Sequence, residues 1–123
     1  MMNYKILVAE DDPITAQVIA KTLDNLEISY TLVDDGEKAI NECKYDYYDM
    51  VLLDMIMPNK DGFTTSKELR RISNSLPIVA FTSLSYTDIS KKLAESGINH
   101  YLGKPRQLDT LQMLLKHYFR TAA

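Results

Sequence analysis

The sequence predicts an α/β protein in which five strands alternate with five helices. Short apolar runs of strand length recur along the chain, and each is followed by a segment whose apolar residues have helical spacing. Strands that are apolar throughout are typical of parallel sheets that helices cover on both faces, with right-handed crossovers. We therefore expect one doubly wound parallel sheet between two layers of helices.

The length and composition indicate a single globular domain over residues 1–123, with 46% hydrophobic and 25% charged residues. A net charge of −3 without a basic stripe argues against a nucleic-acid or membrane surface. Cys43 is the only cysteine, which excludes an internal disulfide and favours a reducing compartment. The sequence contains no apolar run of signal-peptide or membrane-spanning length, so we expect a cytoplasmic location.

The first two strand–helix units begin with apolar runs at 6–9 and 29–33. Pro13 suits the first position of a helix, and Asp12 precedes it as the N-cap residue. The stretch 34–36, Asp-Asp-Gly, predicts a turn that leads into a short second helix. The inward faces of the two helices should carry Ala16, Ile19, Ala20, Leu23 and Leu26 on the first, and Ala39, Ile40 and Cys43 on the second.

The last three units follow the same plan, with strands expected at 50–53, 78–81 and 100–102. The third helix should begin at about Asp61 or Phe63 and end at Ile72, and Gly97 should end the fourth. The predicted apolar faces are Tyr86, Ile89 and Leu93 on the fourth helix, and Leu108, Leu111, Leu114, Leu115, Tyr118 and Phe119 on the fifth, where Met113 points the other way.

Polar side chains follow four of the strands: residues 10–12 are Glu-Asp-Asp, Asp54 and Thr82 come directly after the third and fourth strands, and Lys104 comes two residues after the fifth. Ligands of open parallel sheets bind beyond the carboxyl ends of the strands. Crowded carboxylates need a cation between them, and hard oxygen ligands suit Mg²⁺. A divalent metal, an ammonium and a hydroxyl around one carboxylate form a site for a phosphoryl group, which that carboxylate can accept as a nucleophile.

Four segments in order resemble the receiver domain of two-component response regulators over essentially the whole chain: ILVAEDDP, MVLLDMIMPNKDG, PIVAFTS and HYLGKP. The resemblance implies a flavodoxin-like (βα)5 sandwich with strand order 2-1-3-4-5. It also implies a phosphoacceptor, rather than a conventional enzyme, that is phosphorylated by a sensor histidine kinase or a histidine phosphotransfer protein. The stretch ILVAEDDPIT resembles receivers of hybrid kinases, and the sequence leaves open whether the chain is a stand-alone regulator or part of a longer protein.

The resemblance also implies a role for each residue at the strand ends. Asp54 is the expected phosphoacceptor and a metal ligand, and Lys104 is the lysine that pairs with the phosphoryl group. Glu10 and Asp11 resemble the acidic pair that organises Mg²⁺, with Asp11 as the direct ligand and Glu10 acting through water. Ile56 is expected to bind the metal through its backbone carbonyl. Thr82 and Tyr101 are expected to be the switch residues, a hydroxyl and an aromatic side chain that change position on phosphorylation.

The resemblance further implies a cis peptide bond between Lys104 and Pro105. Arg106 departs from the family pattern, because an aliphatic or aromatic residue often follows the Lys-Pro pair. The fourth helix, the fifth strand and the fifth helix should form the face that regulates a downstream protein. By family analogy, the apolar side chains of Ile56 and Leu84 imply a long-lived phosphorylated state.

Several residues also have simpler interpretations. Asp12 is better explained as a helix cap than as a metal ligand, and Tyr101 could serve only for packing. His100 and His117 lack a third metal ligand and are expected at the surface or in packing contacts. Cys43 fits the core as a small apolar residue.

Three rival functions are compatible with parts of the pattern. A phosphatase of the haloacid dehalogenase type also uses a strand-end aspartate, but it needs a second aspartate where Ile56 stands. A flavodoxin-type binder needs a phosphate-cradling loop after the first strand, where the acidic stretch 10–12 would repel a phosphate. A receiver that acts only as a protein-binding module is disfavoured by the intact set of Asp54, Thr82 and Lys104.

Overall fold

The computed structural model describes residues 3–104 and 108–119, and these residues form alternating strands and helices as predicted. The elements are β1 (Lys5–Ala9), α1 (Pro13–Asn25), β2 (Ser29–Val33), α2 (Gly36–Tyr45), β3 (Met50–Leu53), α3 (Gly62–Ile72), β4 (Ile78–Thr82), α4 (Tyr86–Glu95), β5 (His100–Gly103) and α5 (Leu108–Tyr118). Strands β1, β4 and β5 are each one residue longer than expected, because Lys5 pairs with Ser29 and Thr82 pairs with Gly103.

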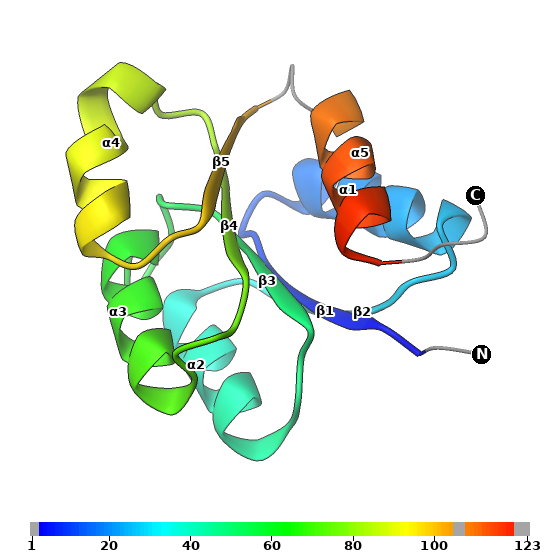
Figure 1. Ribbon diagram of the computed structural model, residues 1–123, viewed down its shortest axis with the longest axis horizontal. Helices are drawn as coiled ribbons and strands as arrows, with labels where there is room; N and C mark the ends of the chain where they lie inside the picture. The colour runs from blue at the N-terminus through cyan, green and yellow to red at the C-terminus, as the bar shows by residue number, and fades with distance from the viewer. Residues whose placement is uncertain (1–2, 105–107, 120–123) are drawn as a thin grey trace.

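The strands form one parallel sheet of order β2-β1-β3-β4-β5, which confirms the predicted order. Helices α1 and α5 cover one face of the sheet, and α2, α3 and α4 cover the other (Figure 1). Ala9 of β1 is aligned with Leu53 of β3, which is aligned with Ala80 of β4. The residues that follow these three strands therefore emerge at one edge of the sheet.

The core consists of two hydrophobic clusters, one on each face of the sheet, because successive strand side chains point to opposite faces. Under α2, α3 and α4, strand residues such as Leu7, Val51 and Ile78 are buried. On the other face, α1 and α5 bury their apolar stripes against β1, β3 and β4, with Ile19, Leu23, Leu111, Leu115 and Phe119 among the buried residues.

Three aspartates cap the helices that follow β1, β2 and β3. The backbone N–H of Thr15 donates to Asp12, and those of Lys38 and Thr64 donate to Asp35 and Asp61. Side-chain caps of this kind satisfy N–H groups that lack a partner within the helix. The capping role predicted for Asp12 and the helix-start role of the 34–36 turn are confirmed, and Asp61 caps the third helix close to its predicted start.

Two tyrosines that the sequence placed on apolar faces are more exposed than expected. Tyr86 is 57% exposed and Tyr118 is 36% exposed, because each lies at an end of its helix. Tyr118 shares a hydrogen bond of 2.7 Å with His100 Nε2, which explains why it turns outward. Met113 is 70% exposed, as predicted. The Leu108 side chain lies outside the described part of the chain.

The beginning and end of the described chain lie together. The Tyr4 and Phe119 rings pack with centroids 4.4 Å apart, which places the start of β1 beside the end of α5 (Figure 1). None of the helices within residues 3–104 and 108–119 has the length and apolar character that a membrane-spanning segment requires.

Candidate functional site

Three carboxylates meet at the edge of the sheet where β1 and β3 end. Glu10 and Asp54 directly follow the aligned residues Ala9 and Leu53, and the Asp54 N–H donates to the Ala9 carbonyl at 3.1 Å. Glu10, Asp11 and Asp54 each offer an oxygen within 4.8 Å of the others. Glu10 is 5% exposed and Asp54 is 6% exposed, whereas Asp11 faces solvent. The predicted acidic cluster is therefore formed, and it is open on the Asp11 side.

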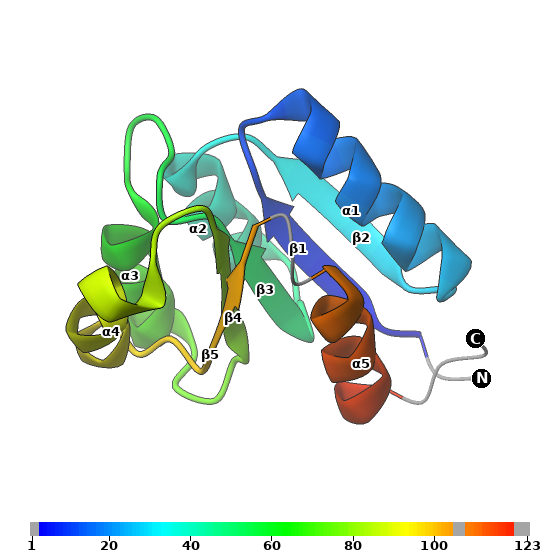
Figure 2. The same cartoon turned by 90° about the horizontal axis from the view of Figure 1, so that it is seen from above.

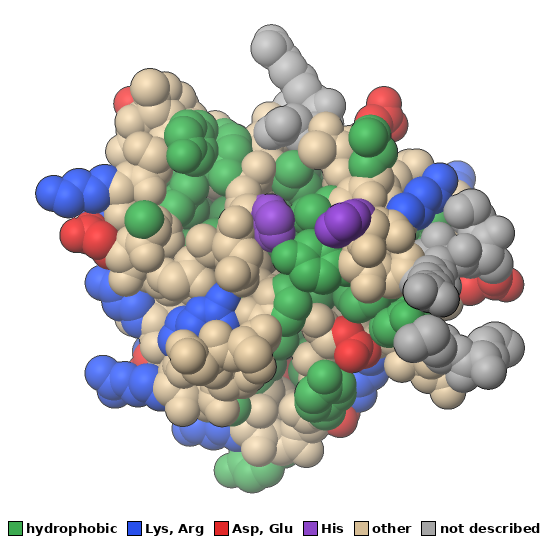
Figure 3. Space-filling model, viewed as in Figure 1, with side chains coloured by type: hydrophobic (Ala, Val, Ile, Leu, Met, Phe, Trp, Pro, Cys, Tyr) green, Lys and Arg blue, Asp and Glu red, His purple; other side chains and the backbone are tan. Residues whose placement is uncertain are grey.

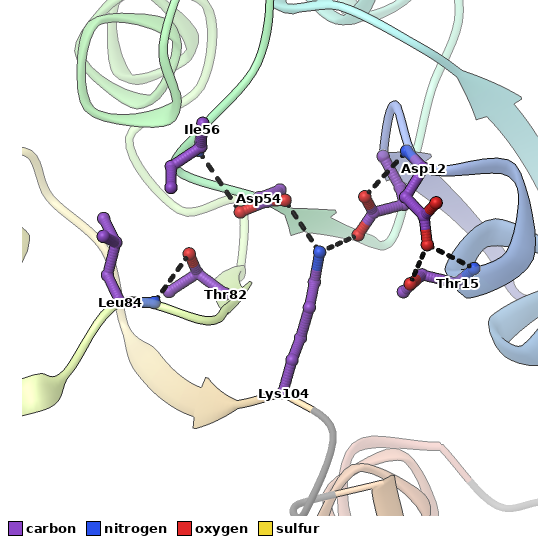
Figure 4. Close-up of polar contacts among 8 residues, drawn as sticks. Asp12, Thr15, Asp54, Ile56, Thr82, Leu84 and Lys104 are labelled. Atoms are coloured by element: carbon purple, nitrogen blue, oxygen red, sulfur yellow. Dashed lines mark hydrogen bonds and ion pairs between the residues drawn. The ribbon is translucent and has the colours of Figure 1, made fainter.

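Lys104 lies between the buried carboxylates of Glu10 and Asp54, and Figure 4 shows its side chain extended towards Asp54. Its Nζ is 2.7 Å from Asp54 Oδ2 and 2.5 Å from Glu10 Oε1. Its backbone N–H donates to the Thr82 carbonyl at 2.9 Å, so the end of β4 fixes the position from which the side chain reaches across. The ammonium group offsets the cost of burying charge at this edge.

Burial and the neighbouring charges shift the pKa values of Glu10 and Lys104. Burial raises the pKa of Glu10, and the nearby Asp54 carboxylate adds to this, although hydrogen bonds from Lys104 and from the Asp12 amide oppose it. Burial lowers the pKa of Lys104, but its hydrogen bonds to Asp54 and Glu10 outweigh burial and raise it overall. Lys104 therefore stays charged, and the ionised form of Glu10 is less favourable at this site than in water.

The donor set suits a small divalent cation. Three carboxylates and one ammonium leave an excess of two negative charges when all are ionised, which a dication would balance. Mg²⁺ prefers hard oxygen ligands, takes one or two carboxylates directly and retains several waters. The exposed position of Asp11 leaves room for such waters, so the residues present fit Mg²⁺.

The loop that follows β3 places Ile56 beside Asp54. The Ile56 N–H donates to Asp54 Oδ1 at 3.2 Å, and its side chain is 54% exposed. Gly62 allows α3 to begin against this loop, because a Cβ at this position would lie 2.3 Å from the Asp54 carbonyl oxygen. The loop thus holds a backbone segment next to the Asp54 carboxylate.

The predicted switch residues are connected through the loop after β4. The Thr82 side chain is fully buried, and its hydroxyl oxygen accepts a hydrogen bond of 3.4 Å from the Leu84 N–H (Figure 4). The Tyr101 hydroxyl donates to the Leu84 carbonyl at 2.6 Å. The Tyr86 ring packs edge-on against Tyr101, with ring centroids 5.3 Å apart. Leu84 therefore contacts both residues through its backbone.

The structure thus brings together four of the predicted site residues, Glu10, Asp11, Asp54 and Lys104. The expected cis bond before Pro105 and the departure at Arg106 lie outside the described residues. Cys43 is partly buried against the core, where burial raises the pKa of its thiol to about 11, in agreement with a packing role.

Sequence reasoning missed a contact between Asn59, in the loop after β3, and Asp35, which was interpreted only as part of a turn away from the site. The Asn59 amide donates to Asp35 Oδ2 at 2.9 Å. The only signal in the sequence is an asparagine in a turn of the type that accepts a positive φ, and this does not identify a partner.

Comparison with known proteins assigns the family. Residues 6–116 match the model of the Response regulator receiver domain family. The chain is 32% identical over 116 residues to the sensor histidine kinase RcsC of Escherichia coli (strain K12), covering 94% of this chain and 12% of that protein. It is also 32% identical over 118 residues to the transcription factor SKN7 of Saccharomyces cerevisiae, covering 96% of this chain and 19% of that protein. The chain therefore corresponds to a small part of these two relatives.

A solved structure agrees with this assignment. The receiver domain of the sensor histidine kinase PA1611 from Pseudomonas aeruginosa PAO1 is 31% identical, with a TM-score of 0.86, and the match covers 95% of this chain and 98% of that chain. That structure has a magnesium ion coordinated in its active site cleft. Receiver domains act with histidine kinases in two-component signalling, and the haloacid dehalogenase and flavodoxin-type alternatives are set aside. This chain belongs to the response regulator receiver domain family.

Proposed function

We propose that Asp54 accepts a phosphoryl group from a phosphohistidine of a sensor histidine kinase or a histidine phosphotransfer protein, in a reaction that requires Mg²⁺. The observation that supports this most directly is the position of Asp54 Oδ2, 2.7 Å from Lys104 Nζ and beside Glu10 and Asp11. A carboxylate nucleophile with a fixed cation on one side and hard oxygen ligands on the other matches the needs of phosphoryl transfer.

In the proposed reaction an oxygen of Asp54 attacks phosphorus, a P–O bond forms and the P–N bond to the donor histidine breaks. The bonding electron pair stays on the histidine nitrogen, and Asp54 becomes an acyl phosphate. Lys104 offers a positive charge to the phosphoryl oxygens within reach of Asp54, and the Ile56 N–H orients the carboxylate. Mg²⁺, held by Asp11, Asp54 and the Ile56 carbonyl, with Glu10 acting through water, would neutralise charge on the transferred group.

We further propose that the signal passes through Thr82 to Tyr101. The Thr82 hydroxyl, which now accepts from the Leu84 N–H, would turn to the phosphoryl group, and the Leu84 backbone would move with it. Since the Tyr101 hydroxyl donates to the Leu84 carbonyl, this movement would reach β5. A downstream protein would bind the face formed by α4, β5 and α5, on which hydrophobic side chains are visible in Figure 3.

Two further proposals concern the cellular location of the chain and the longer protein to which it belongs. The reaction with histidine kinases and the composition favour a cytoplasmic location, where such kinases have access to ATP. The similarity to small parts of RcsC and SKN7 is compatible with a receiver that is part of a longer protein. The identity of the kinase and of the downstream partner would follow from that context.

Phosphorylation of the purified protein tests the proposal. We expect acetyl phosphate with Mg²⁺ to add the mass of one phosphoryl group, and chelation of the metal to prevent the addition. Asp54→Ala and Asp54→Asn should both abolish labelling, because each removes the nucleophilic carboxylate. Asp61→Asn is a matched control that changes a nearby aspartate to a residue that caps helices equally well, and it should label normally.

Two results would contradict the proposal. Normal labelling of Asp54→Asn at the same site would show that another residue is the acceptor. A parent protein that is labelled neither by acetyl phosphate nor by a phosphorylated histidine phosphotransfer protein would instead be a protein-binding module without phosphorylation.

A further inference from the structure

The loop between β3 and α3 contains a strained turn close to Asp54. Asn59 has a φ of 68°, in the left-handed region, and the Lys60 N–H closes a three-residue turn on the Pro58 carbonyl at 2.8 Å. Asparagine tolerates this region better than most residues, but the turn still needs support from its surroundings. Strained backbone of this kind persists where neighbouring contacts hold it, and it is concentrated at functional sites.

The contact that holds the turn is made with the start of α2. Asn59 Nδ2 donates to Asp35 Oδ2 at 2.9 Å, while the other carboxylate oxygen accepts from the Lys38 N–H at 2.8 Å. Asp35 is only 7% exposed, and these hydrogen bonds, the Lys38 one first, lower the pKa of its carboxyl group. Asp35 is thus a fixed, charged acceptor that joins the helix cap to the turn.

The start of α2 and the loop are also packed closely against each other. Gly36 leaves no space for a side chain, since a Cβ there would lie 2.6 Å from the Lys60 carbonyl oxygen and 2.1 Å from Thr65 Oγ1. Lys60 Nζ adds ion pairs to Glu37 at 3.0 Å and to Glu68 at 2.5 Å. Figure 2 shows the loop, in green, rising beside the start of α2.

The same loop carries the backbone that faces Asp54. Its base is closed by the Gly62 N–H, which donates to the Met55 carbonyl at 2.9 Å, and its tip is attached at Asn59. Ile56 lies between these two fixed points and donates its N–H to Asp54 Oδ1. The Asn59–Asp35 hydrogen bond is therefore in a position to set where the Ile56 backbone lies relative to the acidic cluster.

We propose that Asn59 is a positioning residue, which acts through Asp35 to hold the Ile56 backbone in place for cation binding at the Asp54 site. This inference rests on the proposed function of that site. Residues that orient a metal site from outside its ligand set commonly change metal affinity by 10-fold or more when they are replaced, so about a 10-fold weaker Mg²⁺ affinity is expected without the Asn59 amide.

Asn59→Gly separates the hydrogen bond from the backbone conformation, because glycine accepts a positive φ without strain. Titration with Mg²⁺ alone, followed by the amide signals of Ile56 and Asp54, should show affinity about 10-fold weaker than in the parent. The rate of labelling by acetyl phosphate should fall at low Mg²⁺ and largely recover at saturating Mg²⁺. A purely structural role would lower the melting temperature without this dependence on Mg²⁺.

Exchanging Asn59 and Asp35 in a double variant keeps the net charge constant and tests whether Mg²⁺ affinity is recovered. Asn59→Asp alone places a second carboxylate against Asp35 and should break the contact. Combined with Asp35→Asn, it restores a hydrogen bond with donor and acceptor reversed, since asparagine caps helices and aspartate tolerates the left-handed region. The double variant should recover most of the parent's Mg²⁺ affinity. Lys5→Met, which removes a partly exposed ion pair to Asp46 that takes no part in holding the loop, serves as the control and should resemble the parent.

The inference is overturned if Asn59→Gly binds Mg²⁺ with the parent's affinity, or if the exchanged pair binds no better than Asn59→Asp alone. These titrations require no phosphorylation. A parent protein that binds Mg²⁺ but is never labelled would therefore refute the proposed function and leave the positioning role of Asn59 to be decided by the titrations.

Discussion

Glu10 is a residue at which stability and the proposed cation site make opposite demands. Burial favours a neutral side chain, whereas cation binding favours a charged carboxylate. Its carboxylate is almost fully buried, and this burial raises its pKa above the ordinary value. Lys104 compensates in part, but it is shared with Asp54. Ionisation of Glu10 is therefore less favourable in the metal-free fold than in the unfolded chain, and cation binding explains a glutamate at this position better than stability does.

Glu10→Gln should raise the melting temperature in buffer that contains a chelator at neutral pH. The raised pKa means that protonated Glu10 favours the fold below its unfolded pKa, and that this stabilisation is lost as pH rises through the folded pKa. The advantage of the variant should thus shrink as pH falls towards the ordinary glutamate range. Thermal unfolding at several pH values measures this, with exposed Glu95→Gln as the control. A variant that melts below the parent at neutral pH would contradict the argument.

Ile56 and Leu84 bear on how long a phosphorylated state would last. Hydrolysis of an acyl phosphate needs a water oriented opposite Asp54, and a side chain that hydrogen-bonds the water can contribute about 10²–10⁴-fold in rate. The Ile56 side chain is 54% exposed beside Asp54, and Leu84 is partly buried on the neighbouring loop. Neither side chain can orient a water, so we expect slow loss of the phosphoryl group.

The lifetime is measured by the decay of phosphorylated protein in Mg²⁺ buffer. An Ile56→Asn, Leu84→Glu double variant introduces polar side chains at both positions and should decay faster than the parent. Each single variant should fall between them if both positions line the path of the water. Equal decay of the parent and the double variant would show that these side chains do not set the lifetime.

At the scale of elements, the loop between β4 and α4 links Thr82, the last residue of β4, to Tyr101 within β5. Leu84 uses its N–H for one residue and its carbonyl for the other. The adjoining elements present exposed apolar side chains, including Tyr86 on α4 and Met113 on α5. A change at the loop would therefore alter a surface on which a protein could bind.

Phosphorylation should change the amide chemical shifts of the β4–α4 loop, of β5 and of the exposed side of α5. Residues near Tyr45, at the end of α2 and far along the chain from these elements, should change least. The comparison is made by recording spectra before and after acetyl phosphate with Mg²⁺, and Asp54→Asn treated in the same way reports effects of the reagents alone. If the amide chemical shifts of β5 and α5 do not change, the proposed transmission from Thr82 to Tyr101 is wrong.

At the scale of the whole molecule, the elements were predictable because each strand–helix unit is encoded locally. Apolar runs such as 50–53 mark buried strands, and Asp12 and Asp61 mark helix starts. The meeting of Glu10 with Asp54 was also predictable, since parallel strands bring their carboxyl ends to one edge.

Other features depend on tertiary contacts that no local pattern contains. The Asn59–Asp35 hydrogen bond joins two loops that are 24 residues apart, and only the packing of α2 against α3 brings them together. Tyr118 has the spacing of an inward residue, but its position at the end of α5 lets its hydroxyl reach His100 instead.

The contact between Tyr4 and Phe119 has a consequence for how such a unit can be built into larger proteins. Both ends of the described chain leave the fold at one place, at the start of β1, whereas Asp54 lies at the opposite end of the strands. A polypeptide could therefore be spliced into a host chain through a single narrow junction, with its reactive edge facing away from the host. A domain of this kind can be inserted into different proteins without changes to its Asp54 site, because the chain ends and that site lie at opposite ends of the strands.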